Sequence, residues 1–176
     1  AWLDYSERML RGEIEKIPDG RYETEVGWLD DDGVNRGKML PVKVAVEIHG
    51  DEITYDLTGS SDEVATGFNV PFEGTTVSAM TFVTRMIFLD EEAYPVFVPQ
   101  NEGMLRPVNV IAPKGSIFNP NFPRACFARF CQAQRAVDLA LRALAPVVPK
   151  QIAAGSSAHL HFISYSGFDV DEGEYW

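Results

Sequence analysis

The sequence predicts an α+β fold, in which an antiparallel or mixed sheet with a β-meander has two buried helices packed on it. Residues 38–49 alternate between apolar and polar side chains, which is typical of a strand with one buried face. Two later segments, 75–89 and 124–145, repeat apolar residues at three- and four-residue spacing, as core-facing helices do. Because the strand patterns precede the long helices, an α+β arrangement is favoured over alternating β-α-β units.

The first element is a short amphipathic helix. Apolar side chains recur between Trp2 and Ile17, and either Asp4 or Ser6 could cap the N-terminus of this helix. The turn signal Pro18-Asp19-Gly20 ends it.

Three strands follow. We expect them over residues 22–29, 38–49 and 53–57, joined by tight turns into an antiparallel meander with one buried face. The first turn carries three adjacent aspartates, at residues 30–32. They could bind a metal, but calcium loops alternate their ligands along the chain, so a solvated turn is the better interpretation.

The two long helical patterns differ in polarity. The pattern over 75–89 is apolar on all sides except for Arg85, which predicts a helix buried all round. The pattern over 124–145 has a polar stripe of Arg135, Asp138 and Arg142, whose spacing allows ion pairs. This second helix is either a core helix with a salt-bridged edge or one that points Arg129 or Arg135 into a site.

Residues 101–123 form the segment richest in Pro and Gly. A strand is expected over 106–111, followed by a turn with a restrained backbone.

A last strand is expected over 159–164. Its two histidines, His159 and His161, lie on one face and could grip a metal, although no carboxylate stands beside them at ligand spacing.

Composition narrows the class of protein. The chain has 176 residues and a net charge of −11, with no basic cluster, which argues against nucleic acid as a partner. No apolar run reaches membrane-spanning length. Cys126 and Cys131 lie on one predicted helix at a spacing that prevents pairing, which indicates reduced thiols and a cytoplasmic protein. The length fits a single domain over 1–176, and the ends of the sequence suggest a fragment of a longer subunit.

An ordered set of motifs resembles the hydantoinase B/oxoprolinase family. The family's Asn-x-Gly, Arg-Pro, Pro-x-Gly-Ser and Asn-Pro elements match residues 101–120. Its Asp-Phe-Thr-Gly and Asn-x-Pro elements match residues 56–59 and 69–71, and its Gln-Arg-x-x-Asp helix matches residues 134–138. The motifs are weak singly, but their order over most of the chain makes the resemblance specific.

The resemblance implies an enzyme subunit that works with a hydantoinase A-type partner. In this family ATP binds the partner subunit, and a divalent metal is held by residues N-terminal to the region matched here. Members hydrolyse cyclic amides such as hydantoins and 5-oxoproline, or carboxylate ketones such as acetone and acetophenone. The resemblance therefore implies small-molecule substrates, ATP on the partner, and no metal ligands in this segment.

One departure bears on the substrate. Many amidohydrolases of the family carry Gly-Asn-x-Glu-Thr-Ser ahead of the Gln-Arg pair, whereas residues 128–133 read Ala-Arg-Phe-Cys-Gln-Ala. This exchange removes an amide and a carboxylate and adds the cation of Arg129, which suits an anionic substrate. It raises the carboxylase alternative without deciding between the two reactions.

The candidate site residues follow from the motifs. We expect Asn69, Asn101, Glu102 and Arg106 to line or support a catalytic site, and Arg129 and Arg135 to bind substrate. Arg106 would pair with Glu102 or with an anion. The alternatives are structural turns, in which the amides serve the backbone, and a non-catalytic scaffold or interface segment.

Overall fold

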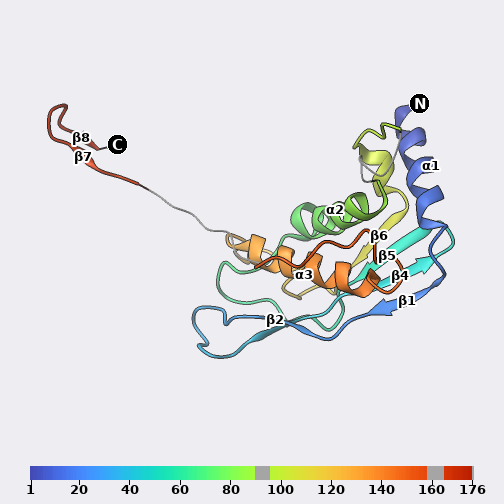
Figure 1. Cartoon of the computed structure of the whole chain (residues 1–176). Helices are drawn as coiled ribbons and strands as arrows, with labels where there is room; N and C mark the ends of the chain where they lie inside the picture. The colour runs from blue at the N-terminus through green and yellow to red at the C-terminus, as the bar shows by residue number, and fades with distance from the viewer. Residues whose placement is uncertain (90–95, 158–164, 176) are drawn as a thin grey trace.

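A four-stranded mixed sheet forms the centre of the chain in the computed structural model, which describes residues 1–89, 96–157 and 165–175 (Figure 1). The first three strands across the sheet pair antiparallel, and the fourth pairs parallel with the third. In spatial order these strands are β1 (Gly20–Glu23), β4 (Ala45–His49), β5 (Glu52–Asp56) and β6 (Val108–Ile111).

The predicted meander is confirmed, but each of its first two strands is broken in two. Between the breaks, β2 (Gly27–Leu29) and β3 (Leu40–Val42) pair as a separate antiparallel ribbon. At the second break, the Ser60 hydroxyl accepts a hydrogen bond from the Lys43 N–H at 3.0 Å and donates one to its carbonyl at 3.1 Å. The backbone of Lys43 is thus satisfied by a side chain, and the chain can leave the main sheet there.

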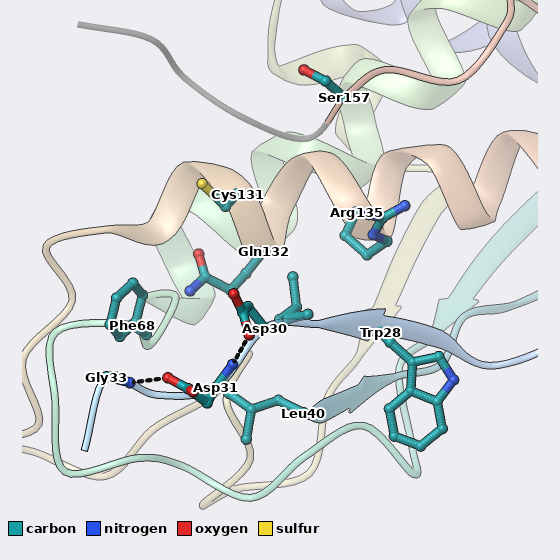
Figure 2. Close-up of a pocket in the computed structure, with 11 residues that line it drawn as sticks. Trp28, Asp30, Asp31, Gly33, Leu40, Phe68, Cys131, Gln132, Arg135 and Ser157 are labelled. Carbon is teal, nitrogen blue, oxygen red and sulfur yellow. Dashed lines mark hydrogen bonds between the residues drawn. The ribbon is translucent and has the colours of Figure 1, made fainter. Parts of the chain in front are cut away.

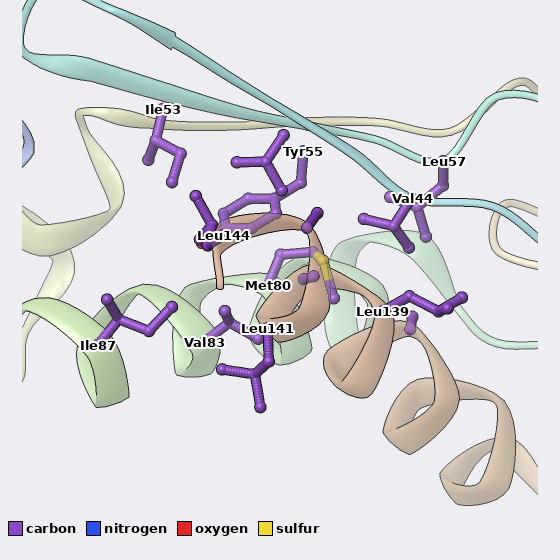
Figure 3. Packing of buried hydrophobic residues seen from close by; sticks show 14 of the residues in the cluster. Val44, Ile53, Tyr55, Leu57, Met80, Val83, Ile87, Leu139, Leu141 and Leu144 are labelled. Carbon is purple, nitrogen blue, oxygen red and sulfur yellow. The ribbon is translucent and has the colours of Figure 1, made fainter. Parts of the chain in front are cut away.

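Two helices, α2 (Val77–Phe88) and α3 (Arg129–Leu144), cover one face of the sheet (Figure 3). The buried Tyr55 hydroxyl is 2.9 Å from the Thr84 hydroxyl, which satisfies both groups inside the core. Burial raises the pKa of Tyr55 far above its ordinary value, so the phenol stays neutral. The core between sheet and helices includes Val44, Ile53, Leu57, Met80, Val83, Ile87, Leu139, Leu141 and Leu144.

The opposite face of the sheet is polar. The Arg21 guanidinium on β1 forms ion pairs with Glu23, Glu47 and Asp56. These groups are 15–59% exposed in their side chains, so they satisfy one another at a wet surface. One apolar and one charged face is the arrangement that the alternation over 38–49 predicts.

Helix α1 (Trp2–Ile14) packs beside the sheet against a short 3₁₀ helix, η2 (Glu102–Leu105). It ends three residues before the predicted end, with Leu10 and Ile14 fully buried. The expected N-caps are wrong, because Asp4 and Ser6 both lie inside the helix. The Ser6 hydroxyl is buried and donates to the Pro99 carbonyl at 2.9 Å.

The starts of α2 and α3 differ from the prediction. A wide helical turn over Phe72–Thr76 precedes α2, and Phe82 is 56% exposed, so α2 is not buried all round as predicted. Helix α3 begins at Arg129 rather than Arg124. The Ala128 N–H donates to the Gly67 carbonyl at 2.8 Å, which holds the preceding segment to a loop in place of helical bonds.

A short hairpin, whose strands β7 (Phe168–Asp169) and β8 (Glu174–Tyr175) have two residues each, follows near the C-terminus. The strand expected over 159–164, with His159 and His161, lies outside the described residues. Within the described part of the chain, none of the helices has the length and apolar character needed to cross a bilayer.

Candidate functional site

A pocket lies where the β2–β3 ribbon meets the N-terminal half of α3 (Figure 2). Its volume is about 420 Å³, which suits a small organic molecule. The ribbon supplies Trp28 and Leu40, and the loop before α2 supplies Phe68, so the walls are largely apolar. The polar lining comprises Asp30, Asp31, Cys131, Gln132, Arg135 and Ser157.

The three polar residues that α3 contributes to the pocket lie on one side of the helix because of their spacing. Cys131 and Arg135 are four residues apart and therefore share a face, and Gln132 stands beside them. The ribbon reaches this face because Gly27 has no side chain. A Cβ at Gly27 would lie 2.7 Å from Cδ1 of the buried Leu139, which is closer than carbon atoms pack.

The floor of the pocket is the acidic loop after β2. The Asp31 carboxylate accepts from the N–H groups of Gly33 and Gly37 at 2.9 and 2.7 Å. The buried Asp32 accepts from the N–H groups of Val34 and Asn35 at 2.9 and 2.6 Å. These carboxylates organise the loop, in agreement with the interpretation as a turn rather than a metal site.

The hydrogen bonds to Asp32 make the loop sensitive to acid. The Asn35 and Val34 N–H groups hold the pKa of Asp32 below its ordinary value of 3.8. A lowered pKa in the folded state contributes stability that is complete above pH 3.8 and is lost as the pH falls through the folded-state value. We therefore expect the melting temperatures of the wild type and Asp32→Asn to differ most near neutral pH and to converge in acid. A gap that stays constant from pH 7 to pH 2 would contradict this role.

Two buried polar atoms at the pocket have no hydrogen-bond partner among the described residues. One is Oε1 of Gln132, whose side chain is only 2% exposed. The other is Nε of Arg135. Figure 2 shows the Gln132 amide pointing from α3 toward Asp30 and Phe68. Buried groups of this kind are costly to leave unpaired.

The predicted salt-bridged edge of this helix is wrong. Asp138 is 8% exposed, and its carboxylate accepts from the Ser156 N–H and hydroxyl at 3.2 and 3.3 Å. Arg142 pairs instead with Glu25 at 2.6 Å. The segment around Ser156 therefore covers Asp138, while Arg135 forms no ion pair within the described part of the chain.

Asn69 lies outside the pocket and is fully buried. Its Oδ1 accepts from the Val64 N–H at 2.8 Å. Its Nδ2 lies 2.9–3.1 Å from the carbonyl oxygens of Val64, Thr66 and Ala125. The amide thus joins two backbone segments 56 residues apart, which favours the structural alternative at this position.

Asn101 and Arg106 lie together, at the contact between η2 and α1. Asn101 caps η2 by accepting from the Gly103 N–H, and its Nδ2 donates to the Ser6 hydroxyl at 2.9 Å. Arg106 pairs with Asp4 and Glu7 at 3.0 and 2.6 Å, so the expected pairing with Glu102 is wrong. These ion pairs raise the pKa of Arg106 and lower that of Glu7.

The six predicted site residues therefore do not form one constellation. Glu102 is exposed in the first turn of η2. The Arg129 guanidinium lies 4.7 Å from the centre of the Phe130 ring and does not line the pocket. Arg135 is the one predicted residue that does, whereas Gln132, Cys131 and the aromatic walls were missed as site residues. The departure from the family pattern at residues 128–133, which places a glutamine three residues before Arg135, could have indicated Gln132.

The closest packing in the predicted motif region explains its glycine. A Cβ on Gly103 would lie 2.0 Å from the Leu3 carbonyl oxygen, so the glycine of the Asn-x-Gly motif allows α1 to pack closely against this segment.

Among the described residues, no three His, Cys, Asp or Glu side chains come together as metal ligands. The described residues therefore do not fit a metal centre.

Among the known proteins similar to this chain are a hydantoinase subunit and a 5-oxoprolinase. The chain is 39% identical, over 98% of its length, to a Pseudomonas protein assigned as the B-type subunit of a D-/L-hydantoinase, of which it covers 31%. It is 28% identical to 5-oxoprolinase 1 of Arabidopsis thaliana over 73% of the chain, which is 10% of that protein. The chain thus spans about a third or less of the relatives it matches.

Two solved structures share the fold. The ATP-dependent caprolactamase of Pseudomonas jessenii matches 85% of this chain with a TM-score of 0.69 and 26% identity, over 24% of its own chain. An acetone carboxylase matches 87% with a TM-score of 0.73 and 18% identity, over 22% of its own chain. The profile of the family described as Hydantoinase B/oxoprolinase matches residues 1–176. The chain therefore belongs to the hydantoinase B/oxoprolinase family.

Proposed function

We propose that this chain is part of a hydantoinase B-type subunit of a cytoplasmic, ATP-dependent enzyme that opens cyclic amides. The support from relatives is the 39% identity to a hydantoinase B-type protein and the structural similarity to an ATP-dependent caprolactamase. ATP would bind a hydantoinase A-type partner subunit, and a divalent metal would bind outside the described segment. Opening the ring adds water across an amide C–N bond and leaves a carboxylate and an amine or ureide.

The pocket beside Arg135 carries the proposal. It is small and apolar-walled, and its lining includes Arg135 and Gln132, whose Nε and Oε1 atoms have no hydrogen-bond partner among the described residues. It is built by the same Gln134-Arg135-x-x-Asp138 helix that matches the family motif. A guanidinium in a partly desolvated pocket can orient a carbonyl or stabilise an oxyanion, which are the groups that amide opening presents.

We expect Arg135→Met to lower kcat/KM of the complete enzyme by about 10- to 100-fold, since a hydrogen bond from a charged donor contributes about 1.5–3 kcal/mol. Arg142→Met on the same helix is the control, because Arg142 is exposed and pairs with Glu25 outside the pocket. The measurement is ATP-dependent ring opening of a hydantoin, with assembly followed by gel filtration. Loss of assembly with normal turnover per complex would instead favour the scaffold or interface alternative.

A carboxylase subunit is the second candidate. Arg129 stands where many family amidohydrolases carry an asparagine. Its guanidinium lies over the Phe130 ring, 4.7 Å from the ring centre. Comparing ATP hydrolysis in the presence of hydantoins with that in the presence of acetone and bicarbonate separates the two reactions. Stimulation by acetone and bicarbonate alone would replace the first candidate with the second.

A further inference from the structure

We infer that the chain associates with a second copy of itself, and that the C-terminal hairpin of each copy docks on an aromatic–basic surface of the other. The C-terminal hairpin is residues 168–175, which contain β7 and β8. The aromatic–basic surface is made of Phe122, Phe127, Phe130, Lys114 and Arg129, beside the N-terminus of α3. The inference goes beyond the function proposed above and does not depend on it.

The segment that leads into α3 exposes three phenylalanine rings. Phe122 is 97% exposed, Phe127 86% and Phe130 45%. Single exposed apolar side chains are common on protein surfaces, but several that lie close together typically mark an interaction site. Three rings within residues 122–130 therefore favour a docking surface.

The backbone of this segment is held in place by hydrogen bonds to a distant loop. The Asn69 Nδ2 donates to the Ala125 carbonyl at 3.0 Å, and the Ala128 N–H donates to the Gly67 carbonyl at 2.8 Å. The rings are thus presented from a backbone that is already ordered, which lowers the entropy cost of binding a partner.

The surface is basic on an acidic chain. Residues 103–137 contain five Lys or Arg and no Asp or Glu, although the whole chain has a net charge of −11. Lys114 lines the same depression as Phe122, and the Arg129 guanidinium lies 4.7 Å from the centre of the Phe130 ring. Within the described part of the chain, neither cation forms an ion pair. The surface therefore fits a partner that is both acidic and aromatic.

The C-terminal hairpin has these two properties. It carries four carboxylates, at residues 169, 171, 172 and 174, and residues 151–176 contain no Lys or Arg. The rings of Phe168 and Tyr175 lie 5.0 Å apart across the two strands, and they remain 51% and 83% exposed. The hairpin is thus complementary to the aromatic–basic surface in charge and shares its aromatic character.

The exposure of both surfaces favours a second copy as the partner. A hairpin of two strands is at best marginally stable in water by itself, and these strands have two residues each. Within one chain, the hairpin rings and the three phenylalanines are all exposed, so the two surfaces do not cover each other. Two copies that exchange hairpins about a two-fold axis would cover both surfaces in a closed dimer.

Sedimentation velocity of the 176-residue chain over a range of concentrations tests this association. Because each contact involves one short hairpin, we expect a weak dimer with a Kd of about 10–100 µM. Phe127→Ser, which removes the ring and keeps the Cβ, should raise this Kd about tenfold or more. Phe82→Ser is the matched control and should leave the Kd unchanged, because Phe82 is 56% exposed on α2 and does not line the depression beside Phe122.

Charge reversal tests whether the contact lies between two copies. A surface variant with Lys114→Glu and Arg129→Glu, and a hairpin variant with Glu172→Lys and Glu174→Lys, should each raise the Kd about tenfold or more, since like charges then face each other. An equimolar mixture of the two variants should dimerise with nearly the wild-type Kd, because each copy then offers the other the opposite charge. A hairpin that docked on its own chain would show no such recovery on mixing.

Cys126 gives a local readout of the same contact. It lines the depression beside Phe122, whereas Cys131 lines the pocket beside the β2–β3 ribbon, and both thiols are unpaired. We expect iodoacetamide labelling of Cys126 to slow several-fold as the chain concentration rises through the Kd, with labelling of Cys131 as the reference in the same sample.

Three results would overturn the inference. They are a chain that stays monomeric at ~500 µM, well above the expected Kd, a dimer with equal Kd values in Phe127→Ser and Phe82→Ser, and a mixture of the two charge variants that stays monomeric. Circular dichroism and melting temperatures establish that each variant is folded, so a loss of association is not a loss of fold.

Discussion

Replacing Gly103 with alanine should destabilise the chain by about 3 kcal/mol, the upper range for overpacking a tight site. The added Cβ would lie 2.0 Å from the Leu3 carbonyl oxygen and 2.7 Å from the Leu3 carbonyl carbon. Both atoms belong to the backbone of α1, so relief requires the whole helix to move away from η2. The measurement is the midpoint of urea unfolding, which should fall in proportion to the lost stability.

Gly12→Ala is the matched control for this prediction. Gly12 lies in α1 itself, and an added Cβ there would meet no atom within 4 Å. Because alanine is a better helix former, this variant should be more stable than wild type by up to about 1 kcal/mol. If Gly103→Ala unfolded at the same urea concentration as wild type, α1 would not be seated on η2 as described.

Asn69→Ala should lower the free energy of unfolding by about 3–5 kcal/mol, because it leaves several buried backbone groups without a hydrogen-bond partner. The Val64 N–H loses its acceptor, and the carbonyl groups of Val64, Thr66 and Ala125 lose a shared donor. The loop before α2 and the segment before α3 would then separate. We expect a lower melting temperature and faster proteolysis near residue 125.

Asn109→Ala is the control for this second variant. Asn109 is exposed on β6, and the same substitution there should change stability by less than about 0.5 kcal/mol. The pair of variants also tests the catalytic role that the motif suggests for Asn69. A stable Asn69→Ala enzyme that assembles but does not turn over would favour catalysis. Normal turnover per folded molecule, with reduced stability, would favour the structural role.

Much of the fold could be predicted because it depends on local periodicity. The alternation over 38–49 identifies β4 and its buried face, since successive side chains of a strand point to opposite sides. The three- and four-residue repeats likewise identify α2 and α3. Their ends were less predictable. The start of α3 depends on Gly67 and Asn69, which are about 60 residues away in sequence.

The candidate site could be predicted only in part. Arg135 stood out as a cation on a helix with a family motif, and it does line the pocket. Asn101 and Arg106 stood out equally, yet their bonds go to Ser6, Asp4 and Glu7 on α1. A sequence motif shows that certain residue types occur at a fixed spacing. It does not show whether those residues take part in catalysis or stabilise the fold.

The sequence by itself determined the family, the α+β class and the existence of the main helices and strands, because these depend on residue order and on side-chain spacing within one element. Only the tertiary structure decided that β6 lies parallel to β5 and that the acidic loop after β2 lines the same pocket as Gln132 and Arg135. These arrangements join residues about 55 to 105 positions apart. Such contacts are selected by packing, as in the space that Gly27 leaves for Leu139, and local periodicity carries no information about them.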